Sequence, residues 1–253
     1  SIKTIIKMNN NQTIERLKSM RLGAMASLHQ QHIQDNGIEK MTADEYLALL
    51  TDHQWEERQN NKIERLIKQA GFREKASIAE VSYSSDRNLD KNMFIRLSTL
   101  DFVKRKENII ITGASGTGKS YLAQALGYQA CLMENRVLYT NTAKLTGRLK
   151  LSKVDGTYLK ELSKIRKVDV LILDDFGLHA FDNQSREILL DVIDERHNYA
   201  STIMSSQIPV SAWYELIGEQ TIADAILDRI VNSSHRIKLE GESLRKGKLN
   251  INR

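Results

Sequence analysis

The sequence has 253 residues, of which 41% are hydrophobic and 27% are charged, and its formal net charge is +5. These values exclude wholesale disorder, and the length allows one α/β core with a smaller domain appended. No apolar run approaches the roughly 18 residues of a membrane-spanning helix, and the polar N-terminus is not typical of a signal peptide. The single cysteine, Cys131, excludes an internal disulfide, so we expect a cytoplasmic location without membrane association.

The chain from Asn10 to about Gly71 has the periodicity of helices. The sequence TADE at 42–45 is typical of a capping box that begins a helix, and Gly71 is expected to end that helix. The stretch DHQWEERQNN between them is so polar that the helix is expected to be either broken or exposed to solvent there. We therefore expect a small all-helical domain over residues 1–76.

Residues 77–107 are expected to form a linker with one short helix, and the hydrophobic period changes after them. Short aliphatic runs then alternate with helical stretches, which predicts a parallel sheet covered by helices on both faces. The predicted strands are NIIIT (108–112), RVLYT (136–140), VDVLILD (168–174), STIMS (201–205) and, as a candidate fifth strand, RIKLE (236–240).

A glycine-rich segment, GASGTGKS at 113–120, lies between the first predicted strand and a helical stretch, and it fits the pattern G-x-x-x-x-G-K-[ST]. Glycines in such a loop let backbone N–H groups curl around an anion, and the helix N-terminus adds partial positive charge. Lys119 is expected to reach the β- and γ-phosphates of ATP, and Ser120 to bind Mg²⁺. The alternative is a glycine-rich turn with an incidental lysine. The expected nucleotide contacts are Gly113, Ala114, Ser115, Gly116, Thr117, Gly118, Lys119, Ser120 and Tyr121.

Two adjacent aspartates, Asp174 and Asp175, end the third predicted strand. A P-loop protein needs an acidic residue at the end of a neighbouring buried strand to organise Mg²⁺, and Asp174 is the natural choice. Because successive side chains of a strand face opposite sides, Asp175 is expected to turn toward the γ-phosphate and orient a water molecule. The alternative is that Asp175 caps the following turn. A second acid beside the γ-phosphate favours hydrolysis over transfer to a small molecule.

The segment from Lys144 to Lys167 carries eight basic and two acidic residues, an excess larger than the net charge of the whole chain. Lysines and arginines there are suited to phosphate contacts, which position a protein on DNA without reading its sequence. The alternative is a solvated basic helix face. The candidate DNA contacts are Lys144, Arg148, Lys150 and Lys153.

The segment GASGTGKS together with LILDDFG (171–177) resembles the AAA+ superfamily of ATPases. Within it, the chain resembles the IstB/DnaC-like group, which includes helicase loaders and ATP-binding helper proteins of insertion-sequence transposition. Three further blocks resemble IstB proteins: RLKSMRLGAMASLHQQ, ERQNNKIERLIKQAGF and IADAILDRIVNSSHRIKLEGESLR. The resemblance spans nearly the whole chain. It implies an α/β fold with an AAA+ P-loop core over 108–253, a parallel five-stranded sheet, no full C-terminal helical lid, and a homo-oligomer with ATP at subunit interfaces.

The resemblance also implies a role for Arg229, which lies in LDRIV and matches the arginine finger of the family. Such a guanidinium reaches the γ-phosphate bound to a neighbouring subunit and neutralises charge that develops on it. The alternative is a salt bridge within the chain, for example with Asp224 or Asp228.

Two further positions are left open by the resemblance. In MSSQIP, either Ser206 or Gln207 is expected to be the polar residue between the water and the γ-phosphate, because relatives more often end this motif in Ser-Asn. Arg245, in GESLR, matches a family position whose role stays open between nucleotide and interface contacts.

The residues and the resemblance together predict an ATP-dependent, DNA-binding ATPase that assembles on duplex DNA, largely independently of its sequence, and assists a transposase of the IstA kind. The alternative is a DnaC-like helicase loader that prefers single strands, although the N-terminal pattern RLKSMRLGAMA favours the transposition helper. A small-molecule P-loop kinase is a third hypothesis, but no segment typical of its arginine-rich lid is evident.

Overall fold

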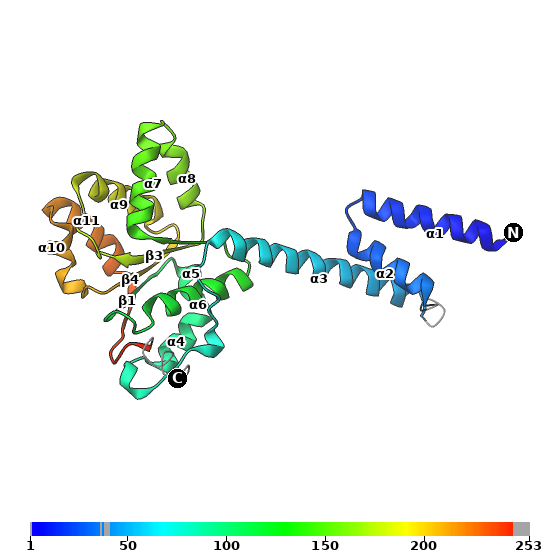
Figure 1. Ribbon diagram of the computed structural model, residues 1–253, viewed down its shortest axis with the longest axis horizontal. Helices are drawn as coiled ribbons and strands as arrows, with labels where there is room; N and C mark the ends of the chain where they lie inside the picture. The colour runs from blue at the N-terminus through cyan, green and yellow to red at the C-terminus, as the bar shows by residue number, and fades with distance from the viewer. Residues whose placement is uncertain (1, 36, 38–40, 245–253) are drawn as a thin grey trace, which may run out of the picture. The chain divides into compact units, whose positions relative to one another are not determined.

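The computed structural model describes residues 2–35, 37 and 41–244. The chain divides into two compact units, residues 1–65 and 66–253 (Figure 1). The first unit contains helices only, and the second contains the sheet and its covering helices. This division differs from the predicted ranges, because residues expected in the helical domain and the linker pack against the sheet.

The first unit is built from α1 (Ile2–Ser19), α2 (Gly23–Gln34) and the first part of α3 (Ala43–Ala70). The predicted capping box begins α3: the Glu45 N–H donates to Thr42 Oγ1 (3.3 Å), and the Thr42 N–H donates to Glu45 Oε2 (2.8 Å). The hydrogen bond from the Thr42 backbone lowers the pKa of the Glu45 carboxyl. The polar middle of α3 is mostly exposed, and the helix continues through it without a break.

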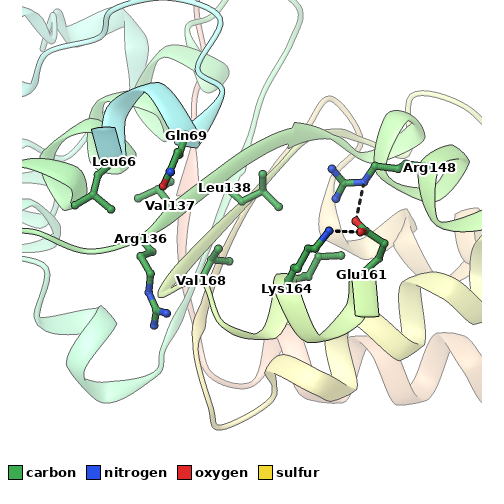
Figure 2. Close-up of a pocket in the computed structure, with 10 residues that line it drawn as sticks. Leu66, Gln69, Arg136, Val137, Leu138, Arg148, Glu161, Lys164 and Val168 are labelled. Atoms are coloured by element: carbon green, nitrogen blue, oxygen red, sulfur yellow. Dashed lines mark hydrogen bonds and ion pairs between the residues drawn. The ribbon is translucent and has the colours of Figure 1, made fainter. Parts of the chain in front are cut away.

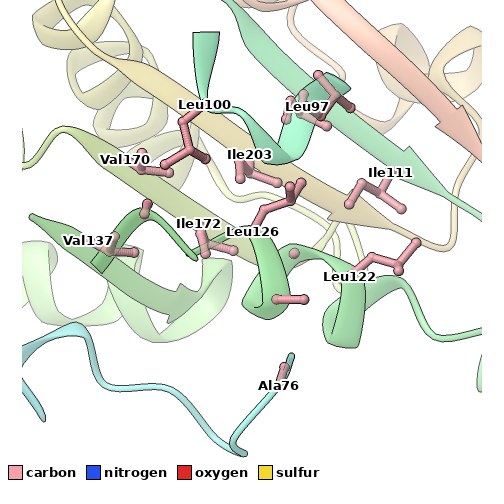
Figure 3. Close-up of a cluster of buried hydrophobic side chains, with 14 of the residues drawn as sticks. Ala76, Leu97, Leu100, Ile111, Leu122, Leu126, Val137, Val170, Ile172 and Ile203 are labelled. Atoms are coloured by element: carbon pink, nitrogen blue, oxygen red, sulfur yellow. The ribbon is translucent and has the colours of Figure 1, made fainter. Parts of the chain in front are cut away.

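The segment predicted to be a linker belongs to the second unit. It contains two short 3-10 helices, η2 (Ile78–Glu80) and η3 (Ser85–Arg87), followed by α4 (Lys91–Ser98) and α5 (Asp101–Arg105). Its apolar side chains, Leu97 among them, are buried in one cluster with side chains of the sheet (Figure 3). Because burying each large aliphatic side chain is worth roughly 1.5–3 kcal/mol, the segment is fixed to the core and does not act as a free connection.

The sheet has five parallel strands in the order β2-β3-β4-β1-β5. The strands are β1 (Asn108–Thr112), β2 (Val137–Asn141), β3 (Val170–Phe176), β4 (Ser201–Ser206) and β5 (Ser234–Lys238). The predicted strands agree with these bounds to within two residues, and the candidate fifth strand is confirmed. Because the strands are parallel, the carboxyl ends of β1, β3 and β4 meet at one edge of the sheet.

Alternate side chains of the strands enter two different cores. Ile109 and Ile111 of β1 lie in the cluster that contains α6 (Lys119–Leu132), whereas Ile110 lies in the cluster on the other face. Strands buried on both faces read as continuous aliphatic runs, which explains why the sequence revealed them. The second face is covered by α7 (Thr142–Val154), α8 (Tyr158–Arg166), α9 (Asn183–Arg196), α10 (Trp213–Ile217) and α11 (Gln220–Val231).

After β5, the described chain continues to Leu244. Within residues 2–35 and 41–244, no helix has the length and apolar character needed to cross a membrane.

Candidate nucleotide-binding site

The predicted P-loop, residues 113–120, connects β1 to α6. Gly113 and Gly118 have positive φ angles of 155° and 93°. A Cβ on Gly113 would lie 2.6 Å from the Leu239 carbonyl oxygen, and a Cβ on Gly118 would lie 2.7 Å from Arg87 Nη2. Both positions therefore require glycine for the loop to hold this shape.

Lys119, the first residue of α6, points back across the loop. Its ammonium donates to the Ala114 carbonyl oxygen (2.7 Å), and the residue is only 7% exposed. The Thr117 hydroxyl donates to the same carbonyl oxygen (2.9 Å). An anion bound by the backbone N–H groups of the loop would therefore lie beside the Lys119 charge.

Asp174 is completely buried at the end of β3, beside the start of α6. Its Oδ1 accepts hydrogen bonds from Ser120 Oγ (2.8 Å), from Ser205 Oγ and from the Asp175 N–H (3.1 Å), and its Oδ2 accepts one from the Tyr139 hydroxyl. Burial, assisted by the hydrogen bond to Asp174, raises the pKa of Tyr139, so this hydroxyl remains a donor. The Ser120 hydroxyl and the Asp174 carboxylate supply hard oxygen atoms of the kind that Mg²⁺ binds, so the pair fits this metal.

Asp175 faces a different environment from its neighbour. Its backbone is left-handed, with a φ of 53°, and the register of β3 against β4 shifts between Leu173 and Phe176. A left-handed backbone costs about 1–3 kcal/mol in a residue other than glycine, and such strain gathers at functional sites. The irregularity turns the Asp175 carboxylate toward Asn141, whose Nδ2 donates to Oδ2 (2.9 Å).

A pocket of about 390 Å³ is lined by the P-loop and by side chains from the same edge of the sheet. Asp175 and Gln207 line this pocket, whereas the buried Asp174 does not. Of the predicted nucleotide contacts, Gly113, Ala114 and Thr117 belong to the loop without lining the pocket. The predicted contacts that line it are Ser115, Gly116, Gly118, Lys119, Ser120 and Tyr121.

The two candidates for the polar residue beside the γ-phosphate lie differently. Ser206 is completely buried; its hydroxyl donates to the Phe176 carbonyl oxygen (2.7 Å) and accepts from the Ile208 N–H (3.0 Å). Gln207 is exposed and lines the pocket. The structure therefore brings Gln207 to the pocket and uses Ser206 to hold the end of β4.

Arg87 is a pocket residue that the sequence analysis missed. It is only 4% exposed, and its guanidinium donates to the carbonyl oxygens of Ser82 and Thr117, the latter at 2.9 Å. Burial lowers the pKa of this guanidinium. The Arg87 carbonyl in turn accepts from the Glu240 N–H (3.0 Å), so the residue ties the segment before β1 to the P-loop and to the chain after β5. No motif marked it, because it lies in the stretch predicted to be a linker.

Arg73 is a second residue that the sequence analysis missed. It follows the end of α3, and its Nη1 lies 3.9 Å from Asp174 Oδ2 while its Nη2 lies 3.8 Å from Asp175 Oδ2. The arginine therefore places a positive charge beside both acids of the predicted site.

Comparison with known proteins identifies the family. The family model for IstB-like ATP-binding proteins matches residues 15–250. The chain belongs to this family. An insertion sequence ATP-binding protein of Sinorhizobium fredii is 41% identical to it over 234 residues, which cover 92% of this chain and 96% of that protein.

Solved structures place the fold of this IstB-like protein among AAA+ proteins. DnaI is 25% identical, with a TM-score of 0.54 over 70% of this chain and 93% of that chain. The DnaC helicase loader is 22% identical, with a TM-score of 0.50 over 62% of this chain and 94% of that chain. Together with the five-stranded parallel sheet, these similarities show the predicted AAA+ P-loop core.

Arg229 of this IstB-like protein lies away from the P-loop pocket of its own chain. Its carbonyl accepts from Asn108 Nδ2 (3.4 Å), and Asn108 begins β1, at the opposite end of that strand from the P-loop. Its Nε pairs with Asp194 of α9, so the salt bridge that forms within the chain has a different partner from the two aspartates considered from the sequence. Arg229 does not line the pocket of the P-loop.

The four predicted DNA contacts lie on α7. Two of them pair with acids at the start of α9 in the same chain. Lys150 Nζ lies 2.6 Å from Asp182 Oδ2, and Lys153 Nζ lies 3.9 Å from Glu187 Oε2. Hydrogen bonds from Lys150 and from the Ser185 backbone lower the pKa of Asp182 to about 2. These two lysines are therefore not simply free charges on a solvated face.

Arg148 and Lys144 complete the predicted set. Arg148 Nε lies 3.9 Å from Glu161 Oε2, and Glu161 also pairs with Lys164; the three side chains line a second pocket of about 410 Å³ (Figure 2). Lys144 is exposed and has no ion pair with another described residue. Arg245, for which the sequence left the role open, lies outside the described residues.

Proposed function

We propose that this IstB-like protein is an Mg²⁺-dependent ATP hydrolase that assembles on duplex DNA and assists a transposase of the IstA kind. The observation that carries the proposal is the meeting of the P-loop with two differently directed carboxylates at one edge of the sheet. The family and the insertion-sequence relative support ATP as the nucleotide and transposition as the context. The single, buried Cys131 is consistent with a cytoplasmic location.

The triphosphate would bind in the P-loop. Backbone N–H groups and the Lys119 ammonium would balance its charge, while Ser120 and Asp174 would hold Mg²⁺. Mg²⁺, when bound, neutralises charge on the β- and γ-phosphate oxygens. No group of three or more His, Cys, Asp or Glu suited to a metal occurs among the described residues.

Hydrolysis needs a water molecule held in line with the γ-phosphate, and two pocket residues suit this task. The Asp175 carboxylate, directed by Asn141, can accept a hydrogen bond from the water, and the Gln207 amide can bind the water or a γ-phosphate oxygen. A positioned base of this kind contributes about 10²–10⁴-fold to a reaction rate. We assign the polar sensing role to Gln207, because the Ser206 hydroxyl is already engaged in the core.

Arg229 would act on the nucleotide of a neighbouring subunit. Its position near the start of β1 keeps it away from the pocket of its own chain, so a role as an arginine finger requires a homo-oligomer with ATP at subunit interfaces. In that state Arg229 would exchange its ion pair with Asp194 for a phosphate. An Arg229→Ala variant is expected to keep its ATP affinity and to lose hydrolysis in the assembled state.

DNA contact is proposed for α7. Partly exposed ion pairs such as those of Arg148 and Lys153 are worth only about 0–1 kcal/mol, so their cations can exchange a carboxylate for a phosphate at little cost. Lys144 is already exposed. Contacts of this kind follow the phosphate backbone and predict binding that is largely independent of sequence.

Light scattering with and without DNA tests the proposal. We expect the protein to form large assemblies on duplex DNA with a non-hydrolysable ATP analogue, and to form them neither without nucleotide nor as the Lys119→Ala variant. Preference for single strands would favour the helicase-loader hypothesis. A monomer under every condition would contradict both.

A further inference from the structure

Arg73 brings a positive charge to the two acids of the site from a segment that the nucleotide motifs do not include. Its guanidinium lies within 3.9 Å of Asp174 Oδ2 and 3.8 Å of Asp175 Oδ2. The carbon atom at the centre of the guanidinium lies 5.7 Å from the centroid of the Tyr139 ring, whose hydroxyl donates to Asp174. One arginine thus bridges the acid assigned to the metal and the acid assigned to water.

The backbone around Arg73 is fixed to the P-loop helix. The Arg73 and Glu74 N–H groups both donate to Gln124 Oε1, at 2.7 and 3.3 Å, and the same side chain donates through Nε2 to the Ser120 carbonyl oxygen (3.2 Å). Gln124 is only 1% exposed. A buried amide that joins these two segments keeps the guanidinium within reach of the acids, because hydrogen bonds of buried groups are costly to break.

Close packing of the preceding residue supports the same placement. The Phe72 ring contacts the rings of Tyr128 and Tyr139, with centroids 6.3 and 6.4 Å apart. A Cβ on Gly127 of α6 would come within 2.9 Å of the Phe72 ring, so the glycine makes room for it. The turn after α3 therefore packs against α6, and the Arg73 side chain extends from this turn to the end of β3.

We propose that Arg73 is a built-in counterion of the Asp174–Asp175 pair and that it sets the affinity of the site for the divalent cation. The inference rests on the proposed Mg²⁺-dependent nucleotide site. A guanidinium beside the two carboxylates offsets part of the charge that attracts a divalent cation, so the cation binds against electrostatic repulsion from Arg73. Half of the Arg73 side chain is exposed, and solvent keeps this repulsion moderate. Arg73 is thus a positioning and charge-setting residue that need not touch the nucleotide.

Binding of Mn²⁺ tests the proposal without any need for hydrolysis or DNA. Mn²⁺ would be titrated into the full chain with a saturating non-hydrolysable ATP analogue, and the loss of the free Mn²⁺ signal would be followed by electron paramagnetic resonance. In Arg73→Ala and Arg73→Gln we expect the half-saturating Mn²⁺ concentration to fall by about three- to tenfold, the size expected for one partly screened charge. Arg73→Lys keeps the charge and is expected to stay within about twofold of the parent.

Arg136→Ala is the matched control, because Arg136 is similarly exposed and pairs with Asp169 instead. It is expected to leave the half-saturating Mn²⁺ concentration unchanged. Unchanged or weaker Mn²⁺ binding in both folded neutral variants of Arg73 would overturn the inference, as would an equal fall in the Arg136 control. If the parent protein itself bound no Mn²⁺ in the presence of the analogue, the proposed metal site would fail instead.

Discussion

The carboxyl edge of the sheet and the outer face of α7 both gather charged side chains, but they hold them differently. At the sheet edge, Asp174 is completely buried and accepts four hydrogen bonds, and Arg87 is only 4% exposed. On α7, Arg148 is half exposed and meets its acid at 3.9 Å. Buried charges with several partners are costly to alter, whereas exposed pairs are worth little. The same residue types therefore form a buried, hydrogen-bonded site at the sheet edge and partly exposed ion pairs on α7.

Lys119→Ala is expected to have the largest effect. It removes the ammonium that lies across the P-loop, so we predict that ATP affinity falls about a hundredfold or more, as expected for a lost charge-assisted contact in a shielded site. Titration of a fluorescent ATP analogue measures this change. Lys144→Ala, an exposed lysine of α7, is the control and should bind the analogue as the parent does. Equal losses of ATP affinity in the two variants would contradict the claim that the P-loop, and not α7, binds the nucleotide.

Arg87→Ala should have the next largest effect, on stability. Without the guanidinium, the carbonyl oxygens of Ser82 and Thr117 lose their donor, and we predict that the free energy of unfolding falls by about 2–4 kcal/mol. Denaturant unfolding provides the measurement. Arg136→Ala, which removes an exposed arginine, should cost less than about 1 kcal/mol. A cost for Arg87→Ala no larger than for this control would show that its burial is not stabilising.

The combined variant Arg148→Ala and Lys153→Ala should have the smallest effect on the fold. Removing two partly exposed ion pairs is expected to change the free energy of unfolding by no more than about 1 kcal/mol in total. Its duplex affinity should fall with a less steep dependence on salt, because two phosphate contacts are lost. Fluorescence anisotropy at several salt concentrations would detect this. Unchanged affinity and salt slope would leave these pairs with a purely structural role.

The sequence revealed the parts of the fold that depend on local pattern. The strands follow from aliphatic runs buried on both faces, and the P-loop follows from glycines with a lysine and a serine at fixed spacing. The left-handed turn at Asp175 could not be predicted, because it arises from the register shift between β3 and β4. Arg73 lies about a hundred residues from the acids that it meets, so no local spacing marked it.

For the basic residues of 144–167, the sequence showed the charges but not their ion-pair partners. The excess of basic residues between 144 and 167 was plain in the sequence, but their partners Asp182 and Glu187 belong to a later part of the chain. Counting charges along one segment therefore overstated how many of them are free. The segment 77–107 differs from the predicted linker for a related reason, since its apolar residues share a core with later parts of the chain, and that core becomes visible only in three dimensions.

Comparing ATP affinity and single-turnover hydrolysis in Asp175→Asn tests most directly the claim that the two acids have separate tasks. Because Asp174, and not Asp175, accepts the hydrogen bond from the Ser120 hydroxyl, we predict that the variant binds the ATP analogue with Mg²⁺ within about threefold of the parent. Its hydrolysis rate should fall by about a hundredfold or more, since the group that orients water is lost. Loss of ATP binding with turnover retained among the bound molecules would contradict the assignment of Asp174 to the metal and Asp175 to water.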